Sequence, residues 1–182
     1  MLEQALDGGV RAVQLREKEL GGRELFFLAE KLKTLCDRYH ASLFINDRVD
    51  VALGVDADGV QLGSASMPTE AVRELLGEKK LIGVSTHSLR EAQEAVRQGA
   101  DFILFGPVYF TSSKTAYGKP QGVGRLKEVV EKISLPVYAI GGIKTENIAE
   151  VKATGIRGIA LISAIISAIE PRGAAQEILK LL

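Results

Sequence analysis

The chain has 182 residues, of which 46% are hydrophobic and 25% carry a charged side chain, as is typical of one globular domain with a sizeable core. Its 23 Lys and Arg residues balance 23 Asp and Glu residues, which argues against a nucleic-acid-binding protein. The longest apolar run is far shorter than the ~20 residues of a membrane helix. A single cysteine, Cys36, excludes an internal disulfide, so we expect a cytoplasmic protein with no membrane partner.

Short apolar runs alternate along the chain with amphipathic stretches that carry charges on one face. Strands are predicted at residues 12–16, 42–46, 59–62, 81–85, 102–105, 136–140 and 158–162. Helices are predicted at residues 22–40, 49–54, 69–76, 89–98, 124–133, 146–153 and 173–182. Because a helix separates the strands, we expect parallel pairing through right-handed crossovers.

The predicted strands are continuous apolar runs, which is typical of a parallel sheet covered by helices. A doubly wound sheet is also parallel and covered by helices. The regular alternation of strands and helices, without a GxGxxG segment, instead favours an α/β fold of the (β/α)8 TIM barrel type over residues 1–182. Such barrels have eight strands, whereas seven are predicted and residues 2–8 have a helical pattern. We therefore expect a barrel that lacks its N-terminal first strand, and truncation is the explanation that we favour.

Polar residues follow most of the predicted strands. In TIM barrels the carboxyl ends of the strands meet at one mouth, where the functional side chains lie. The residues in these positions are Gln14, Arg16, Lys18, Asn46, Asp47, Ser85, His87, Thr111, Ser113, Lys114, Gly141, Gly142 and Ser163. Each residue alone is a weak signal, and the convergence of the set on one mouth favours a binding site for a small molecule.

Two parts of this set suit a phosphorylated ligand. Arg16 and Lys18 are two residues apart at a strand end, so strand alternation would place both cations on one face. The Gly141–Gly142 pair and Ser163 follow the last two strands, where backbone N–H groups often bind phosphate. The alternatives are solvated charges for the first pair and ordinary turn chemistry for the glycines.

Asp47 ends an apolar strand next to these cations. A carboxylate in a phosphate site usually holds Mg²⁺, which prefers oxygen ligands. The alternative is a helix cap, because a predicted helix begins at residue 49.

The long segment 109–122 carries hydroxyl groups and Lys114, which suggests a lid over an anionic substrate. A surface insert is the alternative. Of the two histidines, we expect His40 to be structural and His87 to lie near the mouth. No cluster of His and Cys has the spacing of a zinc site.

Seven sequence segments point to one family when they are taken together. They are VQLREK (13–18), FINDRVDVAL (44–53), GVSTH (83–87), GADFILFGPVY (99–109), TSSK (111–114), AIGGI (139–143) and LISAI (161–165). The chain resembles the thiamine phosphate synthase/TenI family, because these segments occur in that family's order and cover nearly the whole chain after its start.

The resemblance implies a transferase of thiamine biosynthesis. Such an enzyme joins an aminopyrimidine that bears a diphosphate to a thiazole phosphate, and it releases diphosphate. The pyrimidine diphosphate would be held by Gln14, Arg16, Lys18, Asn46, Ser85 and Lys114. The thiazole phosphate would be held by Thr111, Ser113, Gly142, Ile162 and Ser163.

Within this implied site, Asp47 would bind Mg²⁺. Arg16, Lys18, Ser85 and Lys114 would be catalytic, because the departing diphosphate carries negative charge. The two phosphorylated substrates are the expected partners, and the sequence leaves homo-oligomerisation open.

Two departures from the family pattern keep alternatives open. Ser66 stands where the synthase usually has a second acidic Mg²⁺ ligand, and Gln61 replaces the usual histidine of that strand. The same stretch resembles the TenI branch, whose tautomerase histidine is replaced here by Pro107. The alternatives are a TenI-like thiazole tautomerase, for which His87 is the histidine candidate, and a non-catalytic regulatory protein that binds thiazole phosphate.

Overall fold

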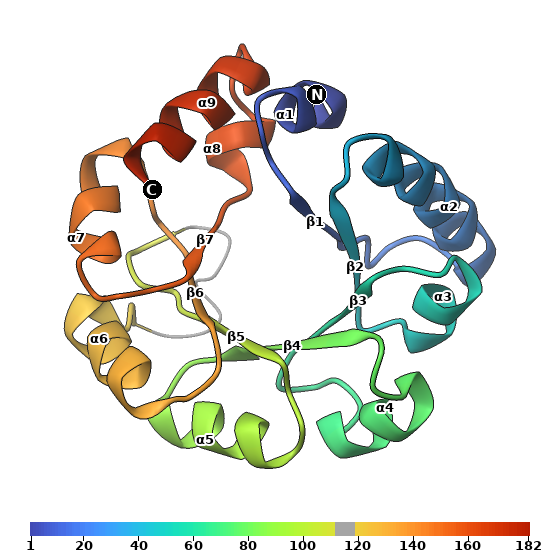
Figure 1. The fold of residues 1–182 in the computed structure, drawn as a ribbon, viewed down its shortest axis with the longest axis horizontal. Coiled ribbons are helices and arrows are strands. Elements are labelled where there is room, and N and C mark those ends of the chain that lie inside the picture. The colour runs from blue at the N-terminus through green and yellow to red at the C-terminus, as the bar shows by residue number, and fades with distance from the viewer. Residues whose placement is uncertain (112–118) are drawn as a thin grey trace.

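The computed structural model describes residues 1–111 and 119–182. Seven parallel strands form one curled sheet in the order β1-β2-β3-β4-β5-β6-β7. Helices surround this sheet on its outer side, so the strands form an inner ring and the helices an outer one (Figure 1). The predicted α/β barrel architecture with seven strands is confirmed.

The strands are β1 (Ala12–Leu15), β2 (Ser42–Asn46), β3 (Gly59–Leu62), β4 (Leu81–Thr86), β5 (Phe102–Phe105), β6 (Val137–Ile140) and β7 (Gly158–Ala160). The helices are α1 (Leu2–Asp7), α2 (Gly22–Arg38), α3 (Val49–Gly54), α4 (Thr69–Leu76), α5 (Leu89–Arg97), α6 (Gly122–Lys132), α7 (Ile148–Lys152), α8 (Ser163–Ile166) and α9 (Pro171–Leu181), and a 3₁₀ turn, η2, covers Thr145–Asn147. None of the described helices is long and apolar enough to cross a membrane.

Three differences from the predicted elements bear on the site. Strand β1 ends at Leu15, one residue before the predicted end at Arg16, and β7 ends at Ala160, two residues before the predicted end at Ile162. The helix predicted at 146–153 begins as the 3₁₀ turn η2, because the Asn147 side chain accepts a hydrogen bond from the Lys144 amide at 2.9 Å. The short helix α8, which follows β7, was not predicted.

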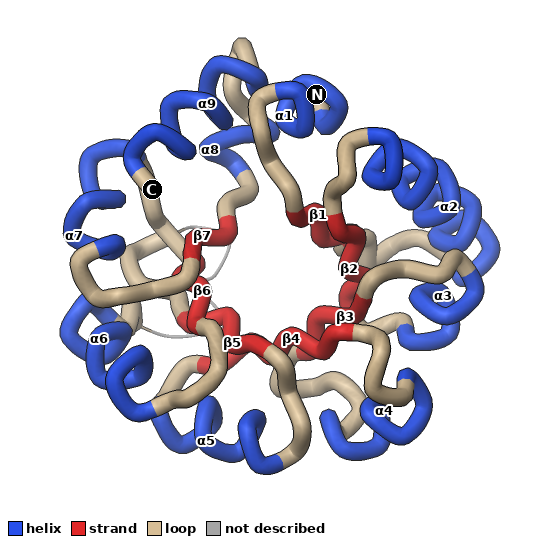
Figure 2. Tube along the Cα trace, viewed as in Figure 1, coloured by secondary structure: helices blue, strands red, loops and turns tan. Residues whose placement is uncertain are grey.

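The hydrophobic core lies between the sheet and the ring of helices, in two clusters. One joins β1–β3 to α2–α4, and the other joins β5 and β6 to α5–α7 and α9; Val84 of β4 packs against both. The ring is closed on the outside by α1 and α9, which lie side by side where β1 and β7 form the two edges of the sheet (Figure 2). This packing is tight, because a Cβ atom on Gly8 would lie 2.6 Å from the Arg172 carbonyl oxygen.

Aromatic side chains fill part of the inner side of the sheet. Phe44 of β2 and Phe102 of β5 meet edge to face with ring centroids 5.3 Å apart, and Phe102 meets Tyr138 of β6 in the same way at 5.6 Å. Gly83 of β4 makes room for them, since a Cβ atom there would lie 2.2 Å from the Phe102 ring. The interior is therefore packed below the mouth, as is usual for a TIM barrel.

Candidate active site

Strand alternation directs the polar side chains of the mouth to the inner side of the sheet. In β2, Leu43 and Ile45 are fully buried against the helices, so Asn46 faces the other way. The parallel register then sets Asn46 beside Gln61 of β3 and Gln61 beside Gly83 of β4. Polar residues that are far apart in the sequence thus become neighbours at the carboxyl ends of four strands.

Hydrogen bonds connect these side chains in pairs across neighbouring strands. Gln14 Nε2 of β1 donates to Asn46 Oδ1 at 2.9 Å. Gln61 Nε2, in a side chain that is 4% exposed, donates to Ser85 Oγ of β4 at 3.0 Å. The structure therefore brings together the predicted residues Gln14, Asn46 and Ser85 in one row, and Gln61 completes it.

Asp47 follows Asn46 at the end of β2, and its backbone adopts the left-handed conformation with φ 61°. Asp tolerates that conformation better than most residues. Asn46 Nδ2 donates to Asp47 Oδ2 at 2.7 Å, and Ser66 Oγ donates to Asp47 Oδ1. Ser66 is held in turn by the Gly63 amide, which donates to its hydroxyl at 2.6 Å.

The alternative role of Asp47 as a helix cap does not match this geometry. Helix α3 has Arg48 at its N-cap without a side-chain capping bond, and the Asp47 carboxylate is bonded to Asn46 and Ser66 instead. The carboxylate therefore faces the polar row rather than the helix.

A cavity of about 320 Å³ lies beside this carboxylate, and Lys18, Asn46, Asp47 and Arg48 contribute to its lining. Arg48 is engaged in a two-point ion pair with Asp50, at 2.9 and 2.6 Å, and this pair lowers the pKa of Asp50. Glu17 also lines this cavity, and within residues 1–111 and 119–182 Lys18 forms no ion pair like that of Arg48.

Arg16 and Lys18 are both exposed, and only Lys18 is part of that lining. Because β1 ends at Leu15, strand alternation does not fix the relative direction of the two cations as the sequence pattern suggested. The predicted role of Arg16 stays a prediction.

The predicted phosphate residues lie at the ends of β6 and β7. Gly141 and Gly142 have φ angles of 98° and 64°, which favour glycine. Ile162 is exposed at the N-cap of α8, and Ser163 is the first residue of that short helix. These positions share the carboxyl side of the sheet with the polar row.

The remaining predicted residues fall near segment 109–122. Thr111 is half-buried, whereas Ser113 and Lys114 lie outside the described residues. His87 follows β4, and its Nδ1 atom contacts the Gly106 carbonyl oxygen. The imidazole is thereby oriented by the backbone that follows β5.

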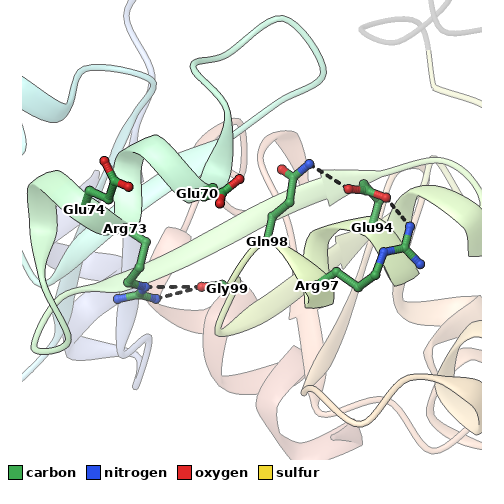
Figure 3. A pocket seen from close by; sticks show the side chains of 7 residues that line it. All are labelled: Glu70, Arg73, Glu74, Glu94, Arg97, Gln98 and Gly99. Atoms are coloured by element: carbon green, nitrogen blue, oxygen red, sulfur yellow. Dashed lines mark hydrogen bonds and ion pairs between the residues drawn. The ribbon is translucent and has the colours of Figure 1, made fainter.

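A second hollow, of about 500 Å³, lies on the outer surface between α4 and α5 (Figure 3). Two of its charged side chains pair with each other, since Glu94 accepts from Arg97, and it also accepts from Gln98. Arg73 donates to the Gly99 carbonyl at 3.0 Å. Gly99 leads into β5, so this groove is remote from the carboxyl ends and we do not assign it to the site.

Sequence reasoning left Gln61 and Ser66 out of the site. Gln61 was visible as an amide within an apolar strand, and its buried bond to Ser85 gives it a place in the row. The family resemblance marked Ser66 as standing at the place of a second Mg²⁺ ligand, but its contact with Asp47 depends on the loop after β3. Among the described residues no group of three or more His, Cys, Asp and Glu side chains could hold a metal ion.

Comparison with known proteins identifies the family. Residues 1–165 match the family model described as thiamine monophosphate synthase. The chain is 46% identical over 178 residues to a thiamine-phosphate synthase of Chlorobium phaeobacteroides, with 98% of this chain and 86% of the relative covered. It is 43% identical over 175 residues to the thiamine-phosphate synthase of Clostridium novyi, with 96% and 86% covered.

A solved structure agrees with the sequence relatives. The thiamine phosphate pyrophosphorylase from Pyrococcus furiosus superposes with a TM-score of 0.92 at 43% identity, covering 99% of this chain and 86% of that one. The fold also resembles 3-hexulose-6-phosphate synthase, with a TM-score of 0.75 at 21% identity, 99% of this chain and 94% of that chain covered. With the family model matching most of its length, the chain belongs to the thiamine monophosphate synthase family.

Proposed function

We propose that this chain is a thiamine-phosphate synthase, a transferase of thiamine biosynthesis that works at the carboxyl ends of its strands. The observation that carries the proposal is the family match over residues 1–165. The row formed by Gln14, Asn46, Gln61 and Ser85 supports it, because it gathers hydrogen-bonding groups where barrel enzymes bind substrates.

The reaction balances without a nucleophile from the protein. The bond between the pyrimidine methylene carbon and the diphosphate oxygen breaks, and diphosphate leaves with the electron pair. The thiazole nitrogen then donates its electron pair to the methylene carbon and forms the new C–N bond. The protein has to stabilise the leaving negative charge, align the two rings and exclude water.

The predicted roles follow from this requirement. Arg16, Lys18 and Lys114 supply positive charge for the diphosphate, and Asn46 and Ser85 orient the pyrimidine substrate. Of Arg16 and Lys18, Lys18 has the better support, since it shares a cavity lining with Asn46 and Asp47. Thr111, Ser113, Gly142, Ile162 and Ser163 would hold the thiazole phosphate.

Mg²⁺ is part of the proposal, with Asp47 as the protein ligand. The donors fit a hard cation in type, because the Asp47 carboxylate and the Ser66 hydroxyl both supply oxygen. Mg²⁺ is commonly bound through one or two carboxylates together with substrate phosphates, and it would supply positive charge for the leaving diphosphate. A cytoplasmic location, for which the lone buried thiol of Cys36 is the support, also belongs to the proposal.

The sequence relatives described above carry synthase names, so the tautomerase and regulatory alternatives are not favoured. A coupling assay tests the proposal. The purified chain is mixed with the pyrimidine diphosphate, the thiazole phosphate and Mg²⁺, and thiamine phosphate is detected by mass spectrometry. We expect product that disappears on chelation. A folded chain that forms no product with both substrates would contradict the proposed function.

A further inference from the structure

The Gly141–Gly142 turn after β6 is enclosed by the backbone that follows β5. A Cβ atom on Gly142 would lie 2.7 Å from Tyr109 Cβ and 2.5 Å from the Phe110 carbonyl oxygen. No side chain fits between the two segments, so any displacement of Tyr109 changes the surroundings of Gly142 directly.

Each carbonyl oxygen of this turn is tied by a neighbour. The Val108 amide donates to the Ile140 carbonyl at 2.9 Å, and the Tyr109 amide donates to the Gly141 carbonyl at 3.0 Å. Asn147 Nδ2 donates to the Gly142 carbonyl at 3.1 Å. Within residues 1–111 and 119–182, the Gly142 amide donates no hydrogen bond to another protein group, so this N–H suits an anion.

The side chain of Tyr109 joins this segment to α7. Its ring packs on the core cluster of β5 and β6, and its hydroxyl donates to Glu150 Oε2 at 2.7 Å. Helix α7 is a firm support, because Ile148 and Val151 are both fully buried. Burial and the Glu150 carboxylate raise the pKa of Tyr109 to about 12, so the hydroxyl stays a donor at neutral pH.

We propose that Tyr109 and Glu150 are positioning residues for the thiazole phosphate. Their hydrogen bond fixes the Tyr109 backbone against Gly142, and that backbone orients the turn whose N–H faces the phosphate. The inference rests on the proposed function for its substrate. Neither residue is assigned to the pyrimidine diphosphate, so the two substrates should respond differently when the bond is removed.

Steady-state kinetics of Tyr109→Phe, Glu150→Ala and the double variant test this inference, because Phe lacks the donor and Ala lacks the acceptor of the bond. Loss of one hydrogen bond should raise KM for the thiazole phosphate about fivefold in each variant, with KM for the pyrimidine diphosphate unchanged. The double variant should be no worse than either single variant, because both remove the same bond. A matched control is Glu128→Ala in α6, where the native carboxylate pairs with Lys132 at the same distance, 2.7 Å, and this variant should leave both KM values unchanged.

A purely structural role would lower the melting temperature and change both KM values together, and either that result or unchanged kinetics would overturn the inference. Calorimetric titration with the thiazole phosphate tests the positioning role separately from the proposed function. If the native chain makes no thiamine phosphate, the function fails, but binding that is about fivefold weaker in Tyr109→Phe would still support the positioning role. Equal binding by native chain and variant, or no binding by either, would overturn it.

Discussion

At the amino end of the sheet, the side chains of Arg73 and Asp101 bind several backbone groups, whereas at the carboxyl end Gln14, Asn46 and Asp47 are joined through their side chains. Arg73 donates to the carbonyl groups of Gly77, Lys80 and Gly99 and pairs with Asp101, which in turn accepts from the Ile82 amide at 2.6 Å. Gln14, Asn46, Asp47 and Ser66 form side-chain contacts at the opposite end.

We infer from this difference that the polar side chains at the amino end serve stability and those at the carboxyl end serve function. A side chain that satisfies backbone groups at the entrance to a strand stabilises the fold, and its loss leaves those groups unpaired. Side chains that pair with one another at the mouth can bind a ligand instead, and the fold then loses little stability. The predictions below test this separation, in order of decreasing effect.

The two ends each contain an aspartate in the left-handed conformation, Asp47 with φ 61° and Asp56 with φ 53°. Asn tolerates the same backbone, so Asp→Asn changes the charge while keeping the shape. We expect Asp47→Asn to lower kcat by about 100-fold or more, because it removes the carboxylate assigned to Mg²⁺. Asp56→Asn, which loses an ion pair with Lys80 at the amino end, should keep kcat.

Steady-state rates and melting curves of both variants make this comparison. Equal losses of activity in the two variants would show that the aspartates are not separated by function.

Arg73 should behave in the opposite way to Asp47. Its side chain is 16% exposed, and Arg73→Ala leaves several carbonyl groups and Asp101 without their donor. We expect the free energy of unfolding in urea to fall by about 2–3 kcal/mol, with kcat/KM retained below the melting temperature. Arg97 lies in the same groove, but its side chain is 65% exposed. Arg97→Ala should therefore change the free energy of unfolding by at most about 0.5 kcal/mol. A large loss of kcat/KM in folded Arg73→Ala would contradict the separation.

A substitution at Ser66 is expected to strengthen Mg²⁺ binding rather than weaken it. Ser66→Asp adds a second carboxylate beside Asp47, so Mg²⁺ binding by calorimetry should become severalfold tighter in the presence of diphosphate. Ser66→Asn is the control for size without charge and should give no increase. Weaker Mg²⁺ binding by Ser66→Asp would place the cation away from Asp47.

Cys36 is expected to give the smallest effect. Burial raises the pKa of this thiol to about 11, from an ordinary value of 9.0. The protonated thiol is therefore favoured in the folded state, and its contribution to stability is complete below pH ~9 and lost as the pH rises through ~11. Iodoacetamide should label the native chain at pH 8 far more slowly than the chain unfolded in urea. Equal labelling rates would show that the thiol is accessible in the fold.

Much of the fold followed from periodicity in the sequence. The predicted bounds of β2, β3 and β5 agree with the structure, because each is a short, mainly apolar segment that ends at a polar residue or is followed by glycine. Helix α8 was missed, since its residues continue an apolar run and carry no capping signal. Helix α5, by contrast, has a capping residue, Ser88, whose hydroxyl accepts a hydrogen bond from the Glu91 amide at 3.2 Å.

The site was predictable only in part. Residues at strand ends, such as Asn46 and Ser85, could be placed by the rule that carboxyl ends converge. The contact of Ser66 with Asp47 and the bond between Tyr109 and Glu150 join segments whose paths depend on loop conformation. No periodic pattern encodes such contacts, so they became visible only in three dimensions.

A crystal structure grown with the thiazole phosphate, diphosphate and Mg²⁺ would test the central claim most directly. The account predicts that the ligands lie at the carboxyl ends of the strands, with diphosphate and Mg²⁺ near Lys18 and Asp47 and the thiazole phosphate at the Gly142 amide. Ligands bound instead in the groove of Arg73 and Glu94 between α4 and α5, with the mouth empty, would contradict it.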